Sequence, residues 1–109
     1  MKTLATMLDI SAYRQRILTS NIANADTPGY RARDIDFQGE LDKALAGGGH
    51  KGGIAIYEPL TTLPNRDGNT VNIDMEMAKV AENSLVYNAA TQLLTMKVRM
   101  LKSVLRGGA

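Results

Sequence analysis

The sequence predicts a mainly α-helical protein, in which a long N-terminal and a long C-terminal helix form an antiparallel coiled-coil pair. An irregular, partly β, Gly-rich segment lies between them. Apolar residues recur near the helical period in residues 2–25, residues 72–106 contain neither Gly nor Pro, and five of the ten glycines lie within residues 47–53. We expect one domain at most, in which the N-terminal helix and its following turn (1–30) form one structural domain with the long C-terminal helix (72–109). Residues 31–71 are expected to form an irregular middle segment with a flexible Gly-rich linker.

The N-terminal helix is predicted over residues 2–25. No Gly or Pro interrupts this stretch, and it ends at a group of turn-forming residues, 24–29. In the sequence Thr-Pro-Gly-Tyr that follows, Pro28 suits the second position of a type II turn and Gly29 the third, where φ is positive. The apolar residues that define the helix are Leu4, Leu8, Ile10, Ile17, Leu18 and Ile22.

The middle segment mixes short elements with turns. Phe37, Leu41 and Leu45 are spaced by four residues and predict a short helix after Asp36. The glycine run of 47–53 predicts a flexible linker, and the sequence Ile-Ala-Ile-Tyr at 54–57 predicts one strand. So long a connection in so small a chain is typical of a segment that is mobile or that a partner orders.

The C-terminal helix carries the strongest structural signal. Asn72 or Asp74 can cap its start, and Gly107 follows its end. Acidic residues lie early in the helix and basic residues late, in agreement with the helix dipole. At about 1.5 Å per residue, the helix would be roughly 50 Å long, which exceeds what a globular domain of this size needs.

Two apolar rows run along this helix, and an N-terminal helix of about 24 residues can cover only one of them. One row runs from Ile73 through Tyr87 to Leu105, and the other from Ala78 through Leu93 to Val104. Because residues 83–96 carry no charge, the helix is typical of one buried on most sides, and only other subunits can bury it in so short a chain. The predicted assembly interface consists of Leu85, Ala89, Leu93, Leu94, Met96, Val98, Met100, Leu101, Val104 and Leu105. The alternative is an isolated two-helix hairpin whose second row stays partly in water.

The composition excludes most catalytic and cofactor-dependent classes. Without Cys the chain has no disulfide scaffold, Cys-ligated zinc, iron–sulfur cluster or thiol nucleophile. A single His rules out a His-based metal cluster and makes any Ser/His/Asp triad depend on His50, which lies alone in the glycine run. We therefore predict no catalytic residue, no cofactor and no metal site.

Charge and hydropathy narrow the class of partner. The net charge of +2 is too weak for a non-specific nucleic-acid binder, and the basic residues of 97–106 fit a solvated face or an acidic protein partner better than DNA. No apolar window is long enough to span a membrane. Asp9, Arg14 and Arg16 interrupt the N-terminal apolar stretch, so we expect no cleaved signal peptide.

Two local patterns imitate functional motifs. The run 47–51 is Gly-Gly-Gly-His-Lys, but no Ser or Thr follows Lys51 as a phosphate-binding loop requires. Asp34 and Asp36 form a carboxylate pair, for which a turn and a helix cap are expected rather than acid/base chemistry.

The segment at the end of the N-terminal helix resembles the signature of the bacterial flagellar axial proteins, the family of rod and hook subunits. The residues that carry this resemblance are Ser20, Asn21, Ile22, Ala23, Asn24, Thr27, Pro28, Gly29 and Tyr30. The blocks at 31–37, 67–72 and 81–87 narrow it to basal-body rod subunits of the proximal rod.

The resemblance implies a structural, non-enzymatic function. In this family the terminal helices line a hollow helical tube that transmits torque and conducts exported subunits. The implied partners are copies of the same chain, other rod proteins, the adaptor that joins the rod to the membrane ring, and the flagellar type III export apparatus. The implied location is the periplasmic part of the basal body, reached without a cleaved signal peptide.

The motif also has a physical interpretation as a corner between the N-terminal helix and the middle segment. Asn21 and Asn24 can bond backbone groups left open by the last helical turn. Pro28 and Gly29 fix the direction in which the chain leaves, and Tyr30 can pack back on the helix or on a neighbouring subunit. A small coiled-coil adaptor or secretion-associated protein outside the flagellum would share the helices without needing this corner.

Overall fold

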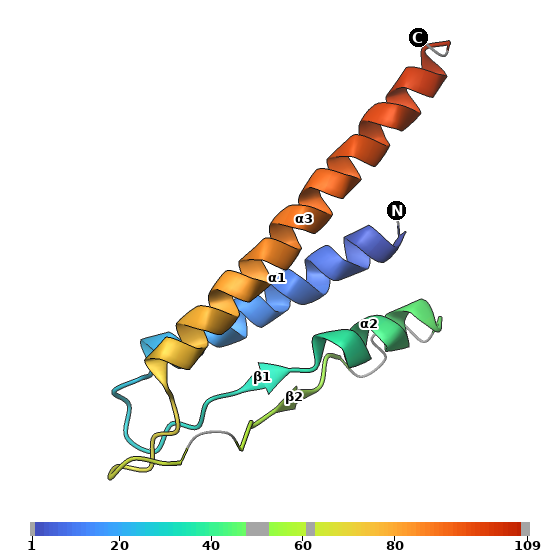
Figure 1. Ribbon diagram of the computed structural model, residues 1–109. Coiled ribbons are helices and arrows are strands. Elements are labelled where there is room, and N and C mark those ends of the chain that lie inside the picture. Colours follow the sequence, from blue (N-terminus) through green and yellow to red (C-terminus); the bar gives the residue numbers. More distant parts are fainter. Residues whose placement is uncertain (1, 48–52, 61–62, 108–109) are drawn as a thin grey trace.

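A computed structural model describes residues 2–47, 53–60 and 63–107. Its elements in chain order are α1 (Lys2–Ala23), β1 (Asp34–Ile35), α2 (Phe37–Leu45), β2 (Ile56–Tyr57) and α3 (Ile73–Leu105). The molecule measures 65 × 27 × 17 Å, and its radius of gyration is 17.7 Å. A compact chain of this length would have about 13 Å, so the fold is elongated. The prediction of a mainly helical protein with two long terminal helices packed together is confirmed (Figure 1).

α1 and α3 run antiparallel. The side chain of Asn21, near the end of α1, bonds Glu76 at the start of α3, whereas Asn83 bonds Ser11 and Gln15 farther back along α1. Because both helices rise equally per residue, this register places Lys2 opposite about residue 95. The rest of α3 extends beyond α1 by about 15 Å, as Figure 1 shows at its C-terminal end.

The face of α3 that meets α1 differs from the two apolar rows expected. Its buried residues are Glu76, Asn83 and Ala90, which are spaced by seven. Two of the three are polar, and they are buried because Asn21, Ser11 and Gln15 on α1 supply hydrogen bonds to them. The expected pairing of α1 with an apolar row was therefore wrong at the centre of this seam.

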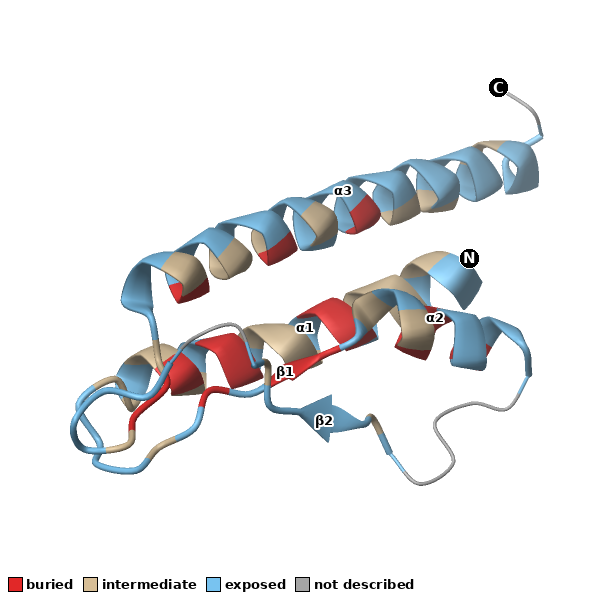
Figure 2. Ribbon diagram, turned by 60° about the horizontal axis from the view of Figure 1, so that its bottom comes forward, coloured by how far each residue is buried: buried red, intermediate tan, exposed pale blue. Residues whose placement is uncertain are grey.

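The apolar core lies on the other side of α1, against the middle segment. Ile10 and Ile17 of α1 pack with Ile35 of β1 and Leu41 of α2. Figure 2 shows the buried residues of α1 lying between α3 and the β1–α2 segment. Each such side chain contributes about 1.5–3 kcal/mol when fully buried. The middle segment therefore closes the only large apolar cluster seen among the described residues.

The middle segment is partly β, with one strand more than predicted. β2 lies within the expected residues 54–57, and it pairs antiparallel with β1, so that Asp34 faces Tyr57 and Ile35 faces Ile56. β1 had no sequence signal, because one of its two residues is charged. Asp34 is a buried strand residue and not a cap, which corrects the expectation for it.

The helix ends agree with the local signals. α2 begins at Phe37 as predicted, with Asp36 in the capping position, though its side chain makes no capping bond. Asn72 caps α3 by accepting the backbone N–H of Met75 at 3.2 Å. Gly29 has a φ of +74°, and the N–H of Tyr30 donates to the carbonyl of Thr27, as a type II turn requires. His50 and most of the glycine linker, 48–52, lie outside the described residues.

Truncating the core should cost much of the stability of so small a domain. Ile10 is fully buried, and we expect Ile10→Ala to lower the free energy of unfolding by about 2–4 kcal/mol. Urea unfolding followed by circular dichroism measures this loss. Leu60→Ala is the control, since that side chain is 93% exposed and its loss should change the free energy of unfolding by less than about 0.5 kcal/mol. Equal effects of the two changes would contradict the core assignment.

Candidate assembly interface and polar corner

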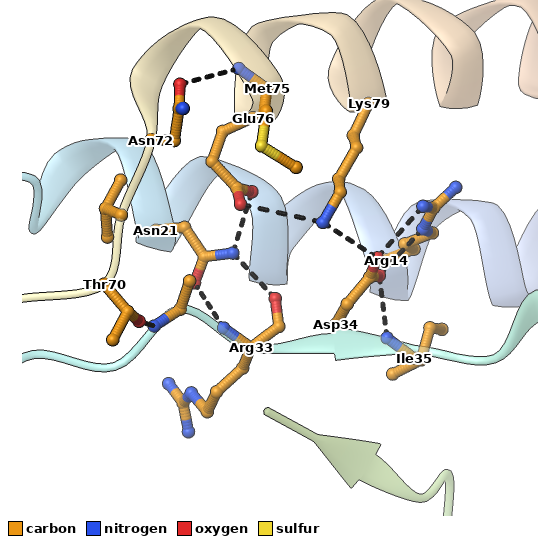
Figure 3. Close-up of polar contacts among 12 residues, drawn as sticks. Arg14, Asn21, Arg33, Asp34, Ile35, Thr70, Asn72, Met75, Glu76 and Lys79 are labelled. Atoms are coloured by element: carbon orange, nitrogen blue, oxygen red, sulfur yellow. Dashed lines mark hydrogen bonds and ion pairs between the residues drawn. The ribbon is translucent and has the colours of Figure 1, made fainter. Parts of the chain in front are cut away.

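The amide of Asn21 joins three segments of the chain at the corner. Its Nδ2 donates to the carbonyl oxygen of Arg33 at 2.7 Å and to Oε2 of Glu76 at 2.9 Å. Its Oδ1 accepts from the backbone N–H of Arg33 at 3.0 Å and from the hydroxyl of Tyr30 at 3.1 Å. The side chain is fully buried, so its two donors and its acceptor oxygen are used without help from water. Figure 3 shows it between the chain leaving the corner and the first turn of α3.

Asn24 acts on the last turn of α1, as the sequence predicted. Its Nδ2 donates to the backbone carbonyl of Ser20 at 2.8 Å, and its Oδ1 accepts from the hydroxyl of Thr27 at 3.0 Å. Asn21, by contrast, bonds groups outside α1, which local reasoning about helix ends missed.

A loop formed by residues 65–72, which we call the second loop, holds the corner in place through hydrogen bonds. Asn69 is buried, and its Nδ2 donates to the carbonyls of Asn24 and Thr27 at 2.9 and 2.8 Å. The N–H of Gly29 donates to the carbonyl of Asp67 at 2.7 Å. Two of the sequence blocks that carried the family resemblance, 20–30 and 67–72, are therefore direct neighbours, although 36 residues separate them in the chain.

Tyr30 packs back on its own chain. Its hydroxyl donates to Oδ1 of Asn21 and lies 3.4 Å from the hydroxyl of Ser20. Of the two partners expected for this ring, the N-terminal helix or a neighbouring subunit, the structure shows the first. The turn at Pro28 and Gly29 thus returns the chain along α1.

A buried ion pair fastens β1 to both long helices. Arg14 donates from Nε and Nη2 to the two carboxylate oxygens of Asp34 at 2.9 and 3.1 Å, and Nζ of Lys79 lies 3.6 Å from Oδ2. Burial raises the pKa of Asp34, but the hydrogen bonds from Arg14 and from the N–H of Ile35 outweigh it, and the pKa lies below its usual value. Asp34 is therefore an anion near neutral pH and does no acid/base work.

The polar contacts form one continuous line between the helices. Lys79 bridges Asp34 to Glu76, whose carboxylate reaches Asn21 (Figure 3). Farther along the seam, Asn83 donates to the carbonyl of Ser11 at 2.8 Å and to Oε1 of Gln15 at 2.9 Å. This polar seam was not predicted from the sequence. The spacing of seven between Glu76 and Asn83 was the signal that could have revealed it.

The predicted assembly residues lie on α3, and most of them are exposed to solvent. Leu85 and Leu105 are 72% and 85% exposed. Leu94 and Val98 are half-buried, since they continue the face that meets α1. Exposed residues of the set are Leu85, Ala89, Leu93, Met96, Met100, Leu101, Val104 and Leu105. An apolar surface of this extent marks an interaction site in proteins.

The described residues offer little for catalysis. They hold no cluster of three or more His, Asp or Glu side chains placed to ligate a metal. A hollow of about 380 Å³ beside α1 and α3 is lined by Ser11, Gln15, Arg16, Asn83 and Tyr87 among others, and none of the described residues that line it carries a carboxylate or an imidazole. Within the described part of the chain, no helix has the length and apolar content to cross a membrane.

Comparison with known proteins gives a consistent result. The family model described as flagella basal body rod protein matches residues 11–31, which include the corner. The chain is 40% identical to the flagellar basal body rod protein FlgB of Salmonella typhimurium over 93% of its own length and 88% of that protein. It is 38% identical to FlgB of Yersinia enterocolitica, covering 93% of this chain and 89% of the relative. With FlgB of Cereibacter sphaeroides it shares 40% identity over 94% of this chain and 91% of the relative.

Replacing the corner amide by a carboxylate tests its role. Asn21→Asp keeps the side-chain shape but removes both donors and sets an anion beside Glu76. We expect the free energy of unfolding to fall by about 2–4 kcal/mol, because buried partners are left unsatisfied. Urea unfolding measures it, with Asn88→Asp on the exposed side of α3 as the matched control. A loss no larger than that of the control would contradict the corner's role.

The Asp34 ion pair should make stability depend on pH. Because the pKa of Asp34 is lower in the folded than in the unfolded chain, its contribution is complete above about pH 4, the unfolded value. It is lost as the pH falls through the folded value. We expect Asp34→Asn to be less stable than the unmodified chain at pH 7 and to show a smaller loss on acidification to pH 2.5. Urea unfolding at both pH values measures this, and identical pH dependence of the two chains would contradict it.

Proposed function

Since the chain belongs to the flagellar basal body rod protein family, we propose that it assembles into the proximal rod through the exposed apolar face of α3. It is a structural subunit of the rod in the flagellar basal body, and this role implies association with other rod components. The observation that carries the proposal is the surface of α3, since Leu85, Leu93, Met96, Met100 and Val104 are each more than half exposed in the single chain.

Burial of this exposed apolar face of α3 against a partner would lower the free energy. Leu85, Leu93 and Met96 are each more than half exposed, and full burial of each gains about 1–2 kcal/mol, as it does for the other exposed apolar side chains of this face. A small domain has only about 5–15 kcal/mol of stability in total. Burial of this face between subunits would therefore add as much free energy as the isolated fold contains.

In the assembled rod, α1 and α3 form the coiled-coil layer of a hollow helical tube. Successive copies pack by heterologous contacts, in which one surface of a subunit meets a different surface of the next. The corner at residues 20–30 sets the angle between this helical layer and the outer middle segment. A rigid corner suits a shaft that transmits torque, and the tube conducts the subunits exported through it.

The partners follow from this place in the basal body. They are copies of the same chain, the other rod proteins, the adaptor between rod and membrane ring, and the type III export apparatus that delivers the subunit. The subunit acts in the periplasmic part of the rod. Residues 1–30 and 72–109 form the helical layer, and residues 31–71 pack on the other side of α1, outside that layer. The function involves no catalysis or cofactor.

Charged substitutions on the exposed face of α3 test the proposal. We expect Leu93→Asp and Met96→Lys to abolish rod assembly and motility while export and the fold of the single chain persist, because these side chains are exposed in the monomer. Swimming assays and electron microscopy of basal bodies measure the outcome. Thr95→Lys is the matched control, since Thr95 is the neighbour of Met96 in the chain and is exposed on a different side of the helix. Cells that carry this substitution should swim. Normal swimming of Leu93→Asp would overturn the proposal.

A further inference from the structure

The hollow beside the seam of α1 and α3 is polar and open to solvent. Its volume is about 380 Å³, and apart from Ala12 each residue that lines it has a hydroxyl, an amide or a guanidinium group. Because a helix turns by about 100° per residue, Ala12 and Gln15 lie on the side of α1 away from Ile10 and Ile17, which pack on the middle segment. The hollow is therefore separate from the apolar core.

Two polar atoms of the residues that line the hollow are buried without a hydrogen-bond partner. They are Oγ of Ser11 and Oδ1 of Asn83, and both residues are at most 1% exposed. Among residues 2–47, 53–60 and 63–107, none donates to Oδ1 of Asn83 and none pairs with the hydroxyl of Ser11. Since a buried polar group without a partner costs free energy, the two atoms indicate a partner that the single chain does not supply.

The orientation of Asn83 decides which kind of group can bind. Its Nδ2 donates to the carbonyl oxygen of Ser11 at 2.8 Å and to Oε1 of Gln15 at 2.9 Å, so both of its protons are used. The amide cannot be turned over, because Oδ1 would then face the Ser11 carbonyl, which has no proton to donate. The group that satisfies Oδ1 must therefore carry a proton on nitrogen or oxygen.

The same two atoms and a nearby charge disfavour an ionic ligand. A carboxylate has no proton for Oδ1 of Asn83, and an ammonium group has no acceptor for the hydroxyl of Ser11. An ammonium group would also meet the guanidinium of Arg16, which lines the hollow and whose Cζ lies 5.4 Å from the centre of the Tyr13 ring. A carboxamide has both an N–H donor and a carbonyl acceptor and carries no charge. One water has both as well, but it occupies only about 30 Å³ of this hollow.

We propose that the hollow binds the side-chain carboxamide of an asparagine or glutamine from a neighbouring protein chain. The N–H of that amide donates to Oδ1 of Asn83, and its carbonyl oxygen accepts from the hydroxyl of Ser11. The inference rests on the proposed function for the source of the amide: a neighbour that lays a helix along the seam has its backbone N–H groups bonded within that helix and offers only side chains. The site lies on a different side of α3 from Leu85 and Met96, so it adds a second contact surface.

Titration of the full chain with small molecules tests the site directly. Acetamide represents the side-chain amide, N-methylacetamide the peptide backbone, and acetate a carboxylate of the same shape. In proton–nitrogen correlation NMR spectra, we expect acetamide to shift the side-chain amide signals of Asn83 and Gln15 saturably, with a midpoint on the order of millimolar. The other two compounds should bind at least about tenfold more weakly.

Two substitutions separate binding from a structural role. Ser11→Ala removes an unpaired buried hydroxyl, so it should leave the single chain at least as stable in urea unfolding, yet weaken acetamide binding about tenfold. Ala12→Phe places a ring at the hollow and should abolish acetamide binding. Ala5→Phe is the matched control, since Ala5 is also exposed on α1 but does not line the hollow, and it should bind acetamide as the unmodified chain does.

These measurements can overturn the site. Absence of a saturable shift with acetamide means that the hollow holds ordered water only. Equal or tighter binding of acetate or N-methylacetamide overturns the assignment to a side-chain amide. A Ser11→Ala chain that loses stability, or that binds acetamide unchanged, shows that the hydroxyl does not serve the ligand.

Swimming assays test the neighbour and keep this inference distinct from the proposed function. Ala12→Phe should reduce motility and the number of assembled rods, whereas Ala12→Ser leaves the hollow open and should swim normally. Normal swimming of Ala12→Phe together with loss of swimming in Leu93→Asp overturns the contact with a neighbour and leaves the proposed function standing. Normal swimming of Leu93→Asp overturns the proposed function, while saturable acetamide binding by the isolated chain still supports the amide site.

Discussion

The buried amide of Asn21 holds α1, the start of α3 and the chain that leaves the corner in a fixed relation to one another. Asn21 binds the backbone of Arg33 on one side and the carboxylate of Glu76 on the other, across sequence separations of 12 and 55 residues. A chain path that separated Arg33 or Glu76 from this amide would leave buried groups without these partners, which is costly in a water-free site. The path of the chain toward β1 and the pairing of α1 with the start of α3 depend on that amide, while Asn69 holds the second loop.

The distribution of polar and apolar residues on α3 is the reverse of the usual one. The side that meets α1 holds Glu76, Asn83 and the Lys79 bridge, whereas Leu85, Leu93 and Met100 face outward. Buried ionic and amide contacts add little net stability, because the cost of removing them from water offsets their attraction. They do disfavour a shifted register, in which they would be left unpaired. The polar seam thus fixes the geometry of the subunit, and the apolar face remains available for binding to neighbours.

Much of the fold could be predicted because it depends on local signals. The hydrophobic period, the absence of Gly and Pro, and the capping position of Asn72 define α1, α2 and α3 almost to the residue. The turn at Gly29 follows from the φ that only glycine adopts without strain. β1 could not be predicted, since a two-residue strand containing Asp34 has no periodicity and exists only through its partner β2 and its ion pair with Arg14.

The sequence by itself determined where the helices begin and end, which residues form the corner, and that α3 has more apolar surface than one helix can cover. Each of these depends on neighbours within a few positions along the chain. Only the tertiary structure decided which side of α3 meets α1 and that Asp34 is a buried anion. Those outcomes depend on two hydrogen-bonded pairs, Asn21 with Glu76 and Arg14 with Asp34. The members of each pair come together only after the chain has turned at the corner. The same pairing leaves Leu85, Leu93 and Met100 facing outward, because α1 meets the polar side of α3 and cannot also cover the opposite, apolar side.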